Sequence, residues 1–218
     1  PKLATTFTHH EQALSMAAEA YYRLTNRPAV VNVTSGPGGT NAITGVYGAY
    51  VDSIGMLVIS GQVKTETTVR ATGLPLRQFG DQELDIEELV RPITKYVTMV
   101  TDPLSIRYHL EKALYLATSG RPGPVWLDIP LDVQAARIDP DQLAGFDPAE
   151  LEEPWKTTDL GAAAAAILEK LRAAERPVVF AGSGVRLSGA HADFLRLIEK
   201  LGVPVVTGWN AHDVLWNA

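Results

Sequence analysis

The chain has 218 residues, no cysteine and a formal net charge of −6, and 46% of its residues are hydrophobic. This apolar content is enough for one large domain or roughly one and a half ordinary ones, while the lack of cysteine excludes a disulfide framework and fits a cytoplasmic protein. The negative charge argues against nucleic acid or an anionic membrane as partner, and no apolar run approaches the roughly 20 residues that span a bilayer.

The first predicted elements frame a glycine-rich turn. We expect a short strand within residues 1–7 and then a helix that begins near Glu11, because apolar residues recur at helical spacing after it, at Ala13, Ala17, Ala20, Tyr21 and Leu24. The apolar run from Ala29 to Val33 predicts a buried parallel strand. The turn that follows spans residues 34–41 and contains three glycines and a proline, so a ligand can approach its backbone closely.

The middle of the chain alternates helix and strand. We expect a helix over Thr40–Tyr50, packed through Gly45 and Gly48, strands over Met56–Ile59, Thr94–Val100 and Pro124–Ile129, and a helix over Leu104–Thr118 with Ile106, Leu110, Ala113, Leu114 and Ala117 facing inward. This alternation predicts an α/β fold with a doubly wound parallel sheet.

Two polar stretches lie between these elements. Residues 64–80 are too long for a simple connection, so they form either a functional loop or a disordered surface excursion. Residues 81–89 gather five carboxylates, but their mixed spacing lacks a metal-ligand pattern and favours a solvated helix start.

The last third of the chain begins with a predicted linker. Residues 139–158 carry three prolines among acidic residues and have no apolar period. After it we expect a second α/β domain over residues 159–218, with a helix over Leu160–Ala174 and a strand that runs into Gly182-Ser183-Gly184. This Gly-x-Gly is a weak signal that indicates either a nucleotide phosphate site or a tight turn. Because the chain opens on Pro1 and not Met, we expect it to be a piece of a longer protein.

Five motifs in order resemble the acetolactate synthase-like thiamine diphosphate enzymes. They are His10-Glu11-Gln12, Thr34-Ser35-Gly36-Pro37-Gly38-Gly39-Thr40-Asn41, Ser60-Gly61-Gln62-Val63, Arg91-Pro92-Ile93-Thr94-Lys95 and Gly120-Arg121-Pro122-Gly123-Pro124-Val125. By this resemblance, residues 1–138 are a pyrimidine-binding domain that lacks its first elements, and residues 159–218 are a truncated central domain.

The resemblance assigns a catalytic role to Glu11. It matches the helix-start glutamate that hydrogen-bonds the aminopyrimidine of thiamine diphosphate and promotes its imino form. A lone helix-start Glu is otherwise ordinary charge complementarity to the helix dipole. We expect partial burial to raise the pKa of Glu11 against the effect of that dipole.

The resemblance also assigns the remaining site residues and cofactors. Gln82, as a second catalytic residue, Pro37 and Asn41 match positions that line the pyrimidine pocket, and Gln62 falls in a matching cofactor-site motif. FAD is a further expected cofactor, with matching contacts from Arg121, Gly182, Ser183 and Gly184. No metal ligand is expected in this chain, because the Mg²⁺ site of the family lies in a third domain. The resemblance further implies a homodimer or homotetramer, and an isolated fragment that is inactive.

Three departures from acetolactate synthases bear on the substrate. The loop before Gln82 is longer, Asp81 replaces a phenylalanine beside the substrate, and Leu131 replaces a lysine; Gly39 in place of alanine is a minor change. The resemblance implies a carboligase that decarboxylates pyruvate and transfers the two-carbon unit to a 2-oxo acid or other carbonyl acceptor. The alternatives are a carboligase acting on a keto-sugar nucleotide, a 2-oxo acid decarboxylase or lyase, and a non-catalytic nucleotide-binding module.

Overall fold

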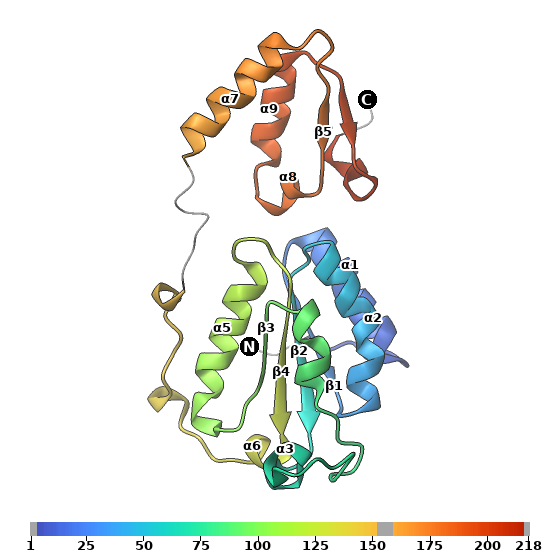
Figure 1. The fold of residues 1–218 in the computed structure, drawn as a ribbon, viewed down its shortest axis with the longest axis vertical. Helices are drawn as coiled ribbons and strands as arrows, with labels where there is room; N and C mark the ends of the chain where they lie inside the picture. Colours follow the sequence, from blue (N-terminus) through green and yellow to red (C-terminus); the bar gives the residue numbers. More distant parts are fainter. Residues whose placement is uncertain (1–3, 152–158, 216–218) are drawn as a thin grey trace. The chain divides into compact units, whose positions relative to one another are not determined.

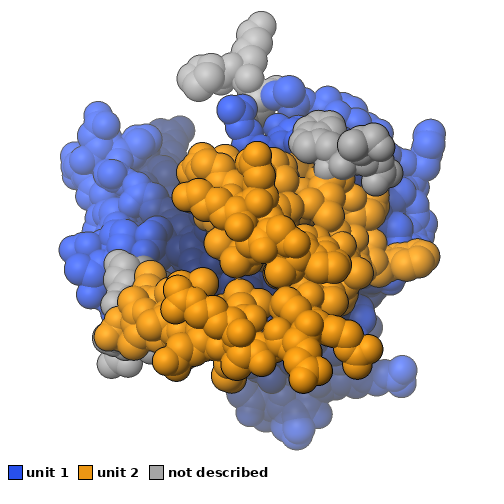
Figure 2. All heavy atoms as spheres, turned by 90° about the horizontal axis from the view of Figure 1, so that it is seen from above, with its two compact units in different colours: residues 1–152 blue, residues 153–218 orange. Residues whose placement is uncertain are grey.

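The structure is a computed structural model that describes residues 4–151 and 159–215. The chain divides into two compact units, residues 1–152 and residues 153–218, which Figure 2 shows in separate colours. Across the described residues, none of the helices combines the length and apolar character needed to span a membrane.

The first unit is built on a parallel four-stranded sheet with the strand order β1-β2-β4-β3. The strands are β1 (Ala29–Val33), β2 (Met56–Gln62), β3 (Tyr96–Met99) and β4 (Pro124–Pro130). Helix α5 (Ile106–Thr118) covers one face, while α1 (Glu11–Thr25) and α2 (Pro37–Val51) lie on the other side (Figure 1). The predicted α/β fold with a parallel sheet is therefore confirmed.

Side chains of the two central strands alternate between the two faces of the sheet. Leu57, Val125 and Leu127 pack against Ala113 and Ala117 of α5. Trp126 points the opposite way, where a Cβ on Gly39 of α2 would lie 3.6 Å from its ring. Both faces of the sheet are thus covered, which is why its strands are almost continuously apolar.

Helices α1 and α2 approach each other through small residues. A Cβ on Gly45 would lie 2.7 Å from the Cβ of Ser15, and still closer to its hydroxyl, so the backbones touch at this point. The buried residues of α1 are Ser15, Ala18 and Tyr22, whereas all five residues that carried the apolar spacing in the sequence are exposed: Ala13, Ala17, Ala20, Tyr21 and Leu24. The face of α1 that packs is therefore not the predicted one, and Ser15 is its residue at the contact with Gly45.

Other local predictions also differ from the structure. Residues 4–7 form no strand, and residues 1–3 of that predicted strand lie outside the described part. Helix α2 begins at Pro37 and not at Thr40, because a proline at the first helical position is already set at a helical φ. Leu114 is 42% exposed and does not face inward, although Ala113 and Ala117 are buried as expected.

The long loop has a defined path that includes a short 3₁₀ turn (Thr65–Thr67) and α3 (Val69–Thr72). The Glu83 carboxylate closes it, accepting hydrogen bonds from the backbone N–H groups of Val69 (2.5 Å), Phe79 (3.3 Å) and Gly80 (3.1 Å). One side chain thus joins both ends of the segment.

The acidic stretch after this loop leads into α4 (Ile86–Val90), whose N-cap is Asp85. Its carboxylates are more engaged than a solvated helix start implies, because Glu87 is largely buried and pairs with Arg70 (2.9 Å) and Arg91 (2.7 Å). Among the described residues there is no group of three or more His, Asp and Glu side chains that could hold a metal ion.

The first unit closes with α6 (Leu131–Gln134) and a segment that packs on α5. The ring of Phe146 lies 5.7 Å from those of Tyr108 and Tyr115, and Arg107 donates a hydrogen bond to the Leu143 carbonyl. Part of the predicted linker, up to residue 151, therefore lies in the first unit, and its residues 152–158 fall outside the described part.

The second unit is a small α/β arrangement around two parallel strands, β5 and β6. Its elements are α7 (Leu160–Ala173), β5 (Val179–Ala181), α8 (Gly184–Leu187), α9 (His191–Leu201) and β6 (Val205–Thr207). Its described core is formed by Ala181, Ala211 and Val214.

Candidate active site

Glu11 lies at the carboxyl edge of the sheet in the first unit. It is the first residue of α1, which runs back towards the start of β1, and β1 then returns the chain to the same edge before α2 begins. The Asn41 amide, on the first turns of α2, donates a hydrogen bond to Glu11 Oε2 at 3.2 Å. The N-cap of α1 is His10, whose Nδ1 accepts from the backbone N–H of Gln12 at 3.1 Å.

The electrostatics of Glu11 differ from the expectation. The pKa of its carboxyl is lowered, first by a hydrogen bond from its own backbone N–H and then by the Asn41 amide, while burial acts in the opposite direction and is outweighed. The predicted rise in its pKa is therefore wrong, because the carboxylate is barely desolvated in this unit and two donors favour its charged form.

At two glycines, Gly36 and Gly38, the backbone near Glu11 carries no side chain. A Cβ on Gly38 would lie 2.7 Å from Thr34 Cγ2 and 3.7 Å from Glu11 Oε1. Gly36 has φ +56°, and a Cβ there would collide with the backbone carbonyl oxygen of Gln82. Only glycine satisfies both the dihedral angle and the close approach at residue 36.

Gln82 reaches this edge through an unusual backbone conformation. Its φ is +54°, in the left-handed region that residues with a Cβ rarely adopt. The close approach to Gly36 fixes Gln82 next to Pro37, the first residue of α2. The structure therefore brings Glu11, Pro37, Asn41 and Gln82 to one edge of the sheet, although they come from three separate segments.

Gln62 has a different environment. It is buried at the end of β2, where its Nε2 donates to the Leu84 carbonyl (3.0 Å) and to Asp128 Oδ2 (2.9 Å), and its Oε1 accepts from the Val63 N–H (3.0 Å). Its amide is thus engaged by protein groups.

The residues expected to contact a flavin lie elsewhere. Arg121 precedes β4, at the amino edge of the sheet and opposite to Glu11, and its Nε donates to Ser53 Oγ at 2.6 Å. Gly182, Ser183 and Gly184 follow β5 in the second unit, where a Cβ on either glycine would meet no described atom within 4 Å.

Asp128 is a buried ionisable group that the sequence analysis did not single out. It is 1% exposed, and burial raises its pKa to about 6, with Asp85 and Glu87 adding to the rise and hydrogen bonds from Ser60 and Gln62 opposing it. The available signal was a single carboxylate inside the otherwise apolar run of β4.

A carboxylate at a helix start, facing bare glycine backbone at the carboxyl edge of a parallel sheet, defines a cofactor-binding α/β domain. Residues 1–89 match the family described as thiamine pyrophosphate enzyme, N-terminal TPP binding domain, and residues 164–217 match the thiamine pyrophosphate enzyme central domain. The chain belongs to the thiamine pyrophosphate enzyme family.

Curated relatives agree with this assignment. The chain is 37% identical over 213 residues to a probable acetolactate synthase large subunit from Methanocaldococcus jannaschii, covering 94% of this chain and 34% of that protein. It is 36% identical over 198 residues to the acetolactate synthase large subunit of Lactococcus lactis (91% and 33%). It is 39% identical over 202 residues to the acetolactate synthase isozyme 3 large subunit of Escherichia coli (90% and 33%). The chain spans about a third of the length of these relatives.

Proposed function

We propose that the whole protein is a thiamine diphosphate-dependent carboligase, similar to acetolactate synthase, that decarboxylates pyruvate and transfers the two-carbon unit to a 2-oxo acid or another carbonyl acceptor. The observation that carries the proposal is Glu11 at the first turn of α1, bonded to Asn41 and facing the bare backbone of Gly38. The relatives named acetolactate synthase support the type of reaction.

The residues at this edge fit the aminopyrimidine ring of the cofactor. A Cβ on Gly38 would lie 3.7 Å from Glu11 Oε1 and crowd Thr34 Cγ2 at 2.7 Å, so glycine keeps this side of Glu11 free of a side chain from residue 38. Pro37 and Asn41 would border that ring, together with Gln82. When bound, thiamine diphosphate supplies the carbanion chemistry of the reaction.

Glu11 provides a charged proton acceptor at a fixed place. Because its pKa is lowered, the carboxylate is ionised at neutral pH and accepts a hydrogen bond from a ring N–H. Asn41 engages Oε2, so Oε1, the oxygen nearest to Gly38, is the atom at which a proton would be exchanged with the ring.

The test is the substitution Glu11→Gln in the full-length protein. We expect turnover to fall by about 100-fold or more, the usual contribution of proton transfer by a positioned side chain, with little change in Tm because the Glu11 side chain is hardly desolvated. Glu19→Gln, on the same helix, removes the same charge outside the site and is expected to keep turnover. Equal turnover in the wild type and in Glu11→Gln would contradict the proposal.

Two exposed side chains favour a second candidate acceptor. Asp81, directly before Gln82, and Leu131, directly after β4, are exposed in this unit. By the resemblance, they stand where acetolactate synthases carry a phenylalanine and a lysine. Loss of an apolar ring and of a cation changes what a pocket for a 2-oxo acid accepts. The second candidate is therefore a carboligase whose acceptor is a keto-sugar nucleotide.

A product assay separates these candidates. The full-length protein is incubated with pyruvate, thiamine diphosphate and Mg²⁺, with and without a keto-sugar nucleotide, and the products are identified by mass spectrometry. Acetolactate from pyruvate alone supports the first candidate, and an adduct formed only with the sugar supports the second. Release of a free aldehyde would indicate a decarboxylase or lyase, and absence of thiamine diphosphate binding despite an intact Glu11 would indicate a non-catalytic module.

The remaining expectations are parts of the same proposal. We propose Mg²⁺ as the second cofactor, held outside this chain, and FAD contacted by Arg121 and by Gly182, Ser183 and Gly184, in a cytoplasmic homodimer or homotetramer. Metal analysis, the absorbance spectrum of the purified protein and light scattering test these points one by one.

A further inference from the structure

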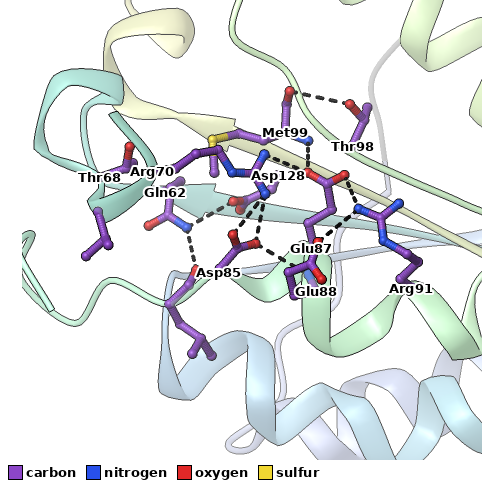
Figure 3. Close-up of polar contacts among 12 residues, drawn as sticks. Gln62, Thr68, Arg70, Asp85, Glu87, Glu88, Arg91, Thr98, Met99 and Asp128 are labelled. Carbon is purple, nitrogen blue, oxygen red and sulfur yellow. Dashed lines mark hydrogen bonds and ion pairs between the residues drawn. The ribbon is translucent and has the colours of Figure 1, made fainter. Parts of the chain in front are cut away.

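A chain of hydrogen-bonded buried side chains links strands β4 and β2 beneath the candidate site. The indole N–H of Trp126 donates to Ser60 Oγ (2.8 Å), and the Ser60 hydroxyl donates to Asp128 Oδ1 (2.5 Å). The other carboxylate oxygen of Asp128 accepts from Gln62 Nε2 (2.9 Å), as Figure 3 shows. Each oxygen of this buried carboxylate thus has a donor, which offsets the cost of removing it from water.

These hydrogen bonds continue to the chain segment that carries Gln82. Gln62 Nε2 also donates to the backbone carbonyl of Leu84 (3.0 Å), two residues after Gln82. The Gln62 Oε1 accepts from the Val63 N–H, which determines which way round the amide lies. Gln62 is therefore a direct link between the sheet and residues 82–84.

The two sides of Gln82 are held by different groups. Glu83 joins the chain to the preceding loop through three backbone N–H groups. The Leu84 carbonyl is held by Gln62 and also accepts from the Ile86 N–H (2.9 Å) at the start of α4. Of these contacts, that of Gln62 is the one that reaches the sheet. A left-handed residue such as Gln82 persists only where its surroundings enforce it.

We propose that Gln62, backed by Asp128, is a positioning residue that holds residues 82–84 against Gly36 and thereby fixes Gln82 at the active site. This role rests on the proposed function, in which Gln82 borders the cofactor. Gln62 acts through the backbone of its neighbours and not through contact with the reacting atoms.

The first test uses Gln62→Met, which keeps the size of the side chain and removes its donors. Ser60→Ala is the matched control, because it removes the hydrogen bonds of Ser60 with Asp128 and Trp126 in the same network and leaves the link from Gln62 to Leu84 intact. Amide hydrogen exchange is measured on the full-length protein without cofactor, so this result stands whether or not the proposed reaction is correct.

In Gln62→Met we expect exchange at the Glu83 and Ile86 amides to rise about tenfold relative to Ser60→Ala, the factor expected for one lost hydrogen bond of typical strength. Equal exchange in the two variants would overturn the proposal. Should Gln62→Met fail to fold, Gln62→Leu replaces it, since leucine also lacks a donor to the Leu84 carbonyl and places no second carboxylate beside Asp128.

Steady-state kinetics then test whether the placement of residues 82–84 by Gln62 affects turnover. We expect Gln62→Met to lower kcat by about tenfold or more, since small misplacements at a site reduce turnover strongly, and Ser60→Ala to leave kcat within about twofold of the wild type. Equal kcat losses in both variants would show a merely structural role and would overturn the proposal. If Glu11→Gln retained turnover, the proposed function would fail while the exchange result would still decide the role of Gln62.

Discussion

At the scale of single residues, Gly36 is the point on which the site depends. Its backbone combines φ +56° with ψ −114°, and the Gln82 carbonyl oxygen occupies the place where a side chain would begin. The conformation and the close approach are separate constraints. Gly73 is a milder reference for both, because its backbone is ordinary left-handed (φ +65°, ψ 9°) and its Cβ would meet no described atom within 4 Å.

We predict that Gly36→Ala destabilises the full-length protein by at least about 2 kcal/mol more than Gly73→Ala, which should cost about 1 kcal/mol for its left-handed backbone alone. Urea unfolding of both variants measures the difference. Gly36→Ala should also lose turnover, because Gln82 must move away. Similar stability of the two variants would show that the close approach at residue 36 is absent in solution.

The sequence identified those site residues that lie next to recognisable local features. Glu11 precedes a helical period, and Pro37 and Asn41 follow a strand end, so their common edge follows from the topology of a parallel sheet. The partnership of Gln62 with Asp128 joins positions 66 residues apart, and no local pattern encodes it. The predicted rise in the pKa of Glu11 was wrong for two reasons: the hydrogen bond from its own backbone N–H outweighs the slight burial, and the Asn41 amide of another helix adds to the lowering.

At the scale of elements, the close contact between α1 and α2 determines which face of α1 is buried. Ser15 of α1 faces Gly45, so the two backbones come into contact there. The hydrophobic spacing predicted a packed face of Ala13, Ala17, Ala20, Tyr21 and Leu24, yet all five are exposed and the polar Ser15 lies at the crossing. Close helix packing needs small residues at the crossing, and a period of apolar residues does not reveal them.

We predict opposite effects for two neighbouring glycines of α2. Gly45→Ala should destabilise the protein by about 1–3 kcal/mol, because its Cβ would press on Ser15 and on the Met16 backbone at 2.8 Å. Gly48→Ala should be neutral or stabilising by up to about 1 kcal/mol, since its nearest neighbour is the flexible Glu19 carboxylate at 3.2 Å and alanine favours helix. Thermal unfolding distinguishes them, and an equal loss in both would contradict the close contact between α1 and α2.

Most helices and strands of the first unit could be predicted from the sequence, but the residues at which they end could not. Strands β1, β2 and β4 follow from their apolar runs, but the prediction ended β2 at Ile59, whereas the structure continues it to Gln62. The extension contains Ser60 and Gln62, polar residues that an apolar run does not signal. Their burial is explained by hydrogen bonds to Asp128 on the neighbouring strand and to Trp126 and Leu84.

At the scale of the whole molecule, Asp128 links stability to pH. Its pKa is raised from 3.8 to about 6, so the folded protein holds a proton there that the unfolded chain has released at the same pH. Stability from this group is therefore greatest below about pH 4 and is lost as the pH rises through about 6, by at most about 3 kcal/mol. Glu87, with a lowered pKa, acts in the opposite direction.

We predict that Asp128→Asn removes the part of the pH dependence that belongs to Asp128. Urea unfolding between about pH 4 and pH 7 should give curves for the wild type and the variant that differ in slope, with the wild type losing stability relative to the variant as the pH rises. The charged groups around this site are Asp85, Glu87, Arg70 and Arg91, and all remain in the variant. Parallel curves would mean that Asp128 does not titrate in this range.

The carboxylate of Glu83 has a consequence for how this domain can be altered. Since one side chain joins residues 69, 79 and 80, the closure of the loop does not depend on the number of residues between its ends. Longer loops cost little additional closure entropy. Residues 73–77 should therefore tolerate inserted or exchanged sequence. Such a change would alter the loop at the carboxyl edge of the sheet and leave the rest of the domain intact.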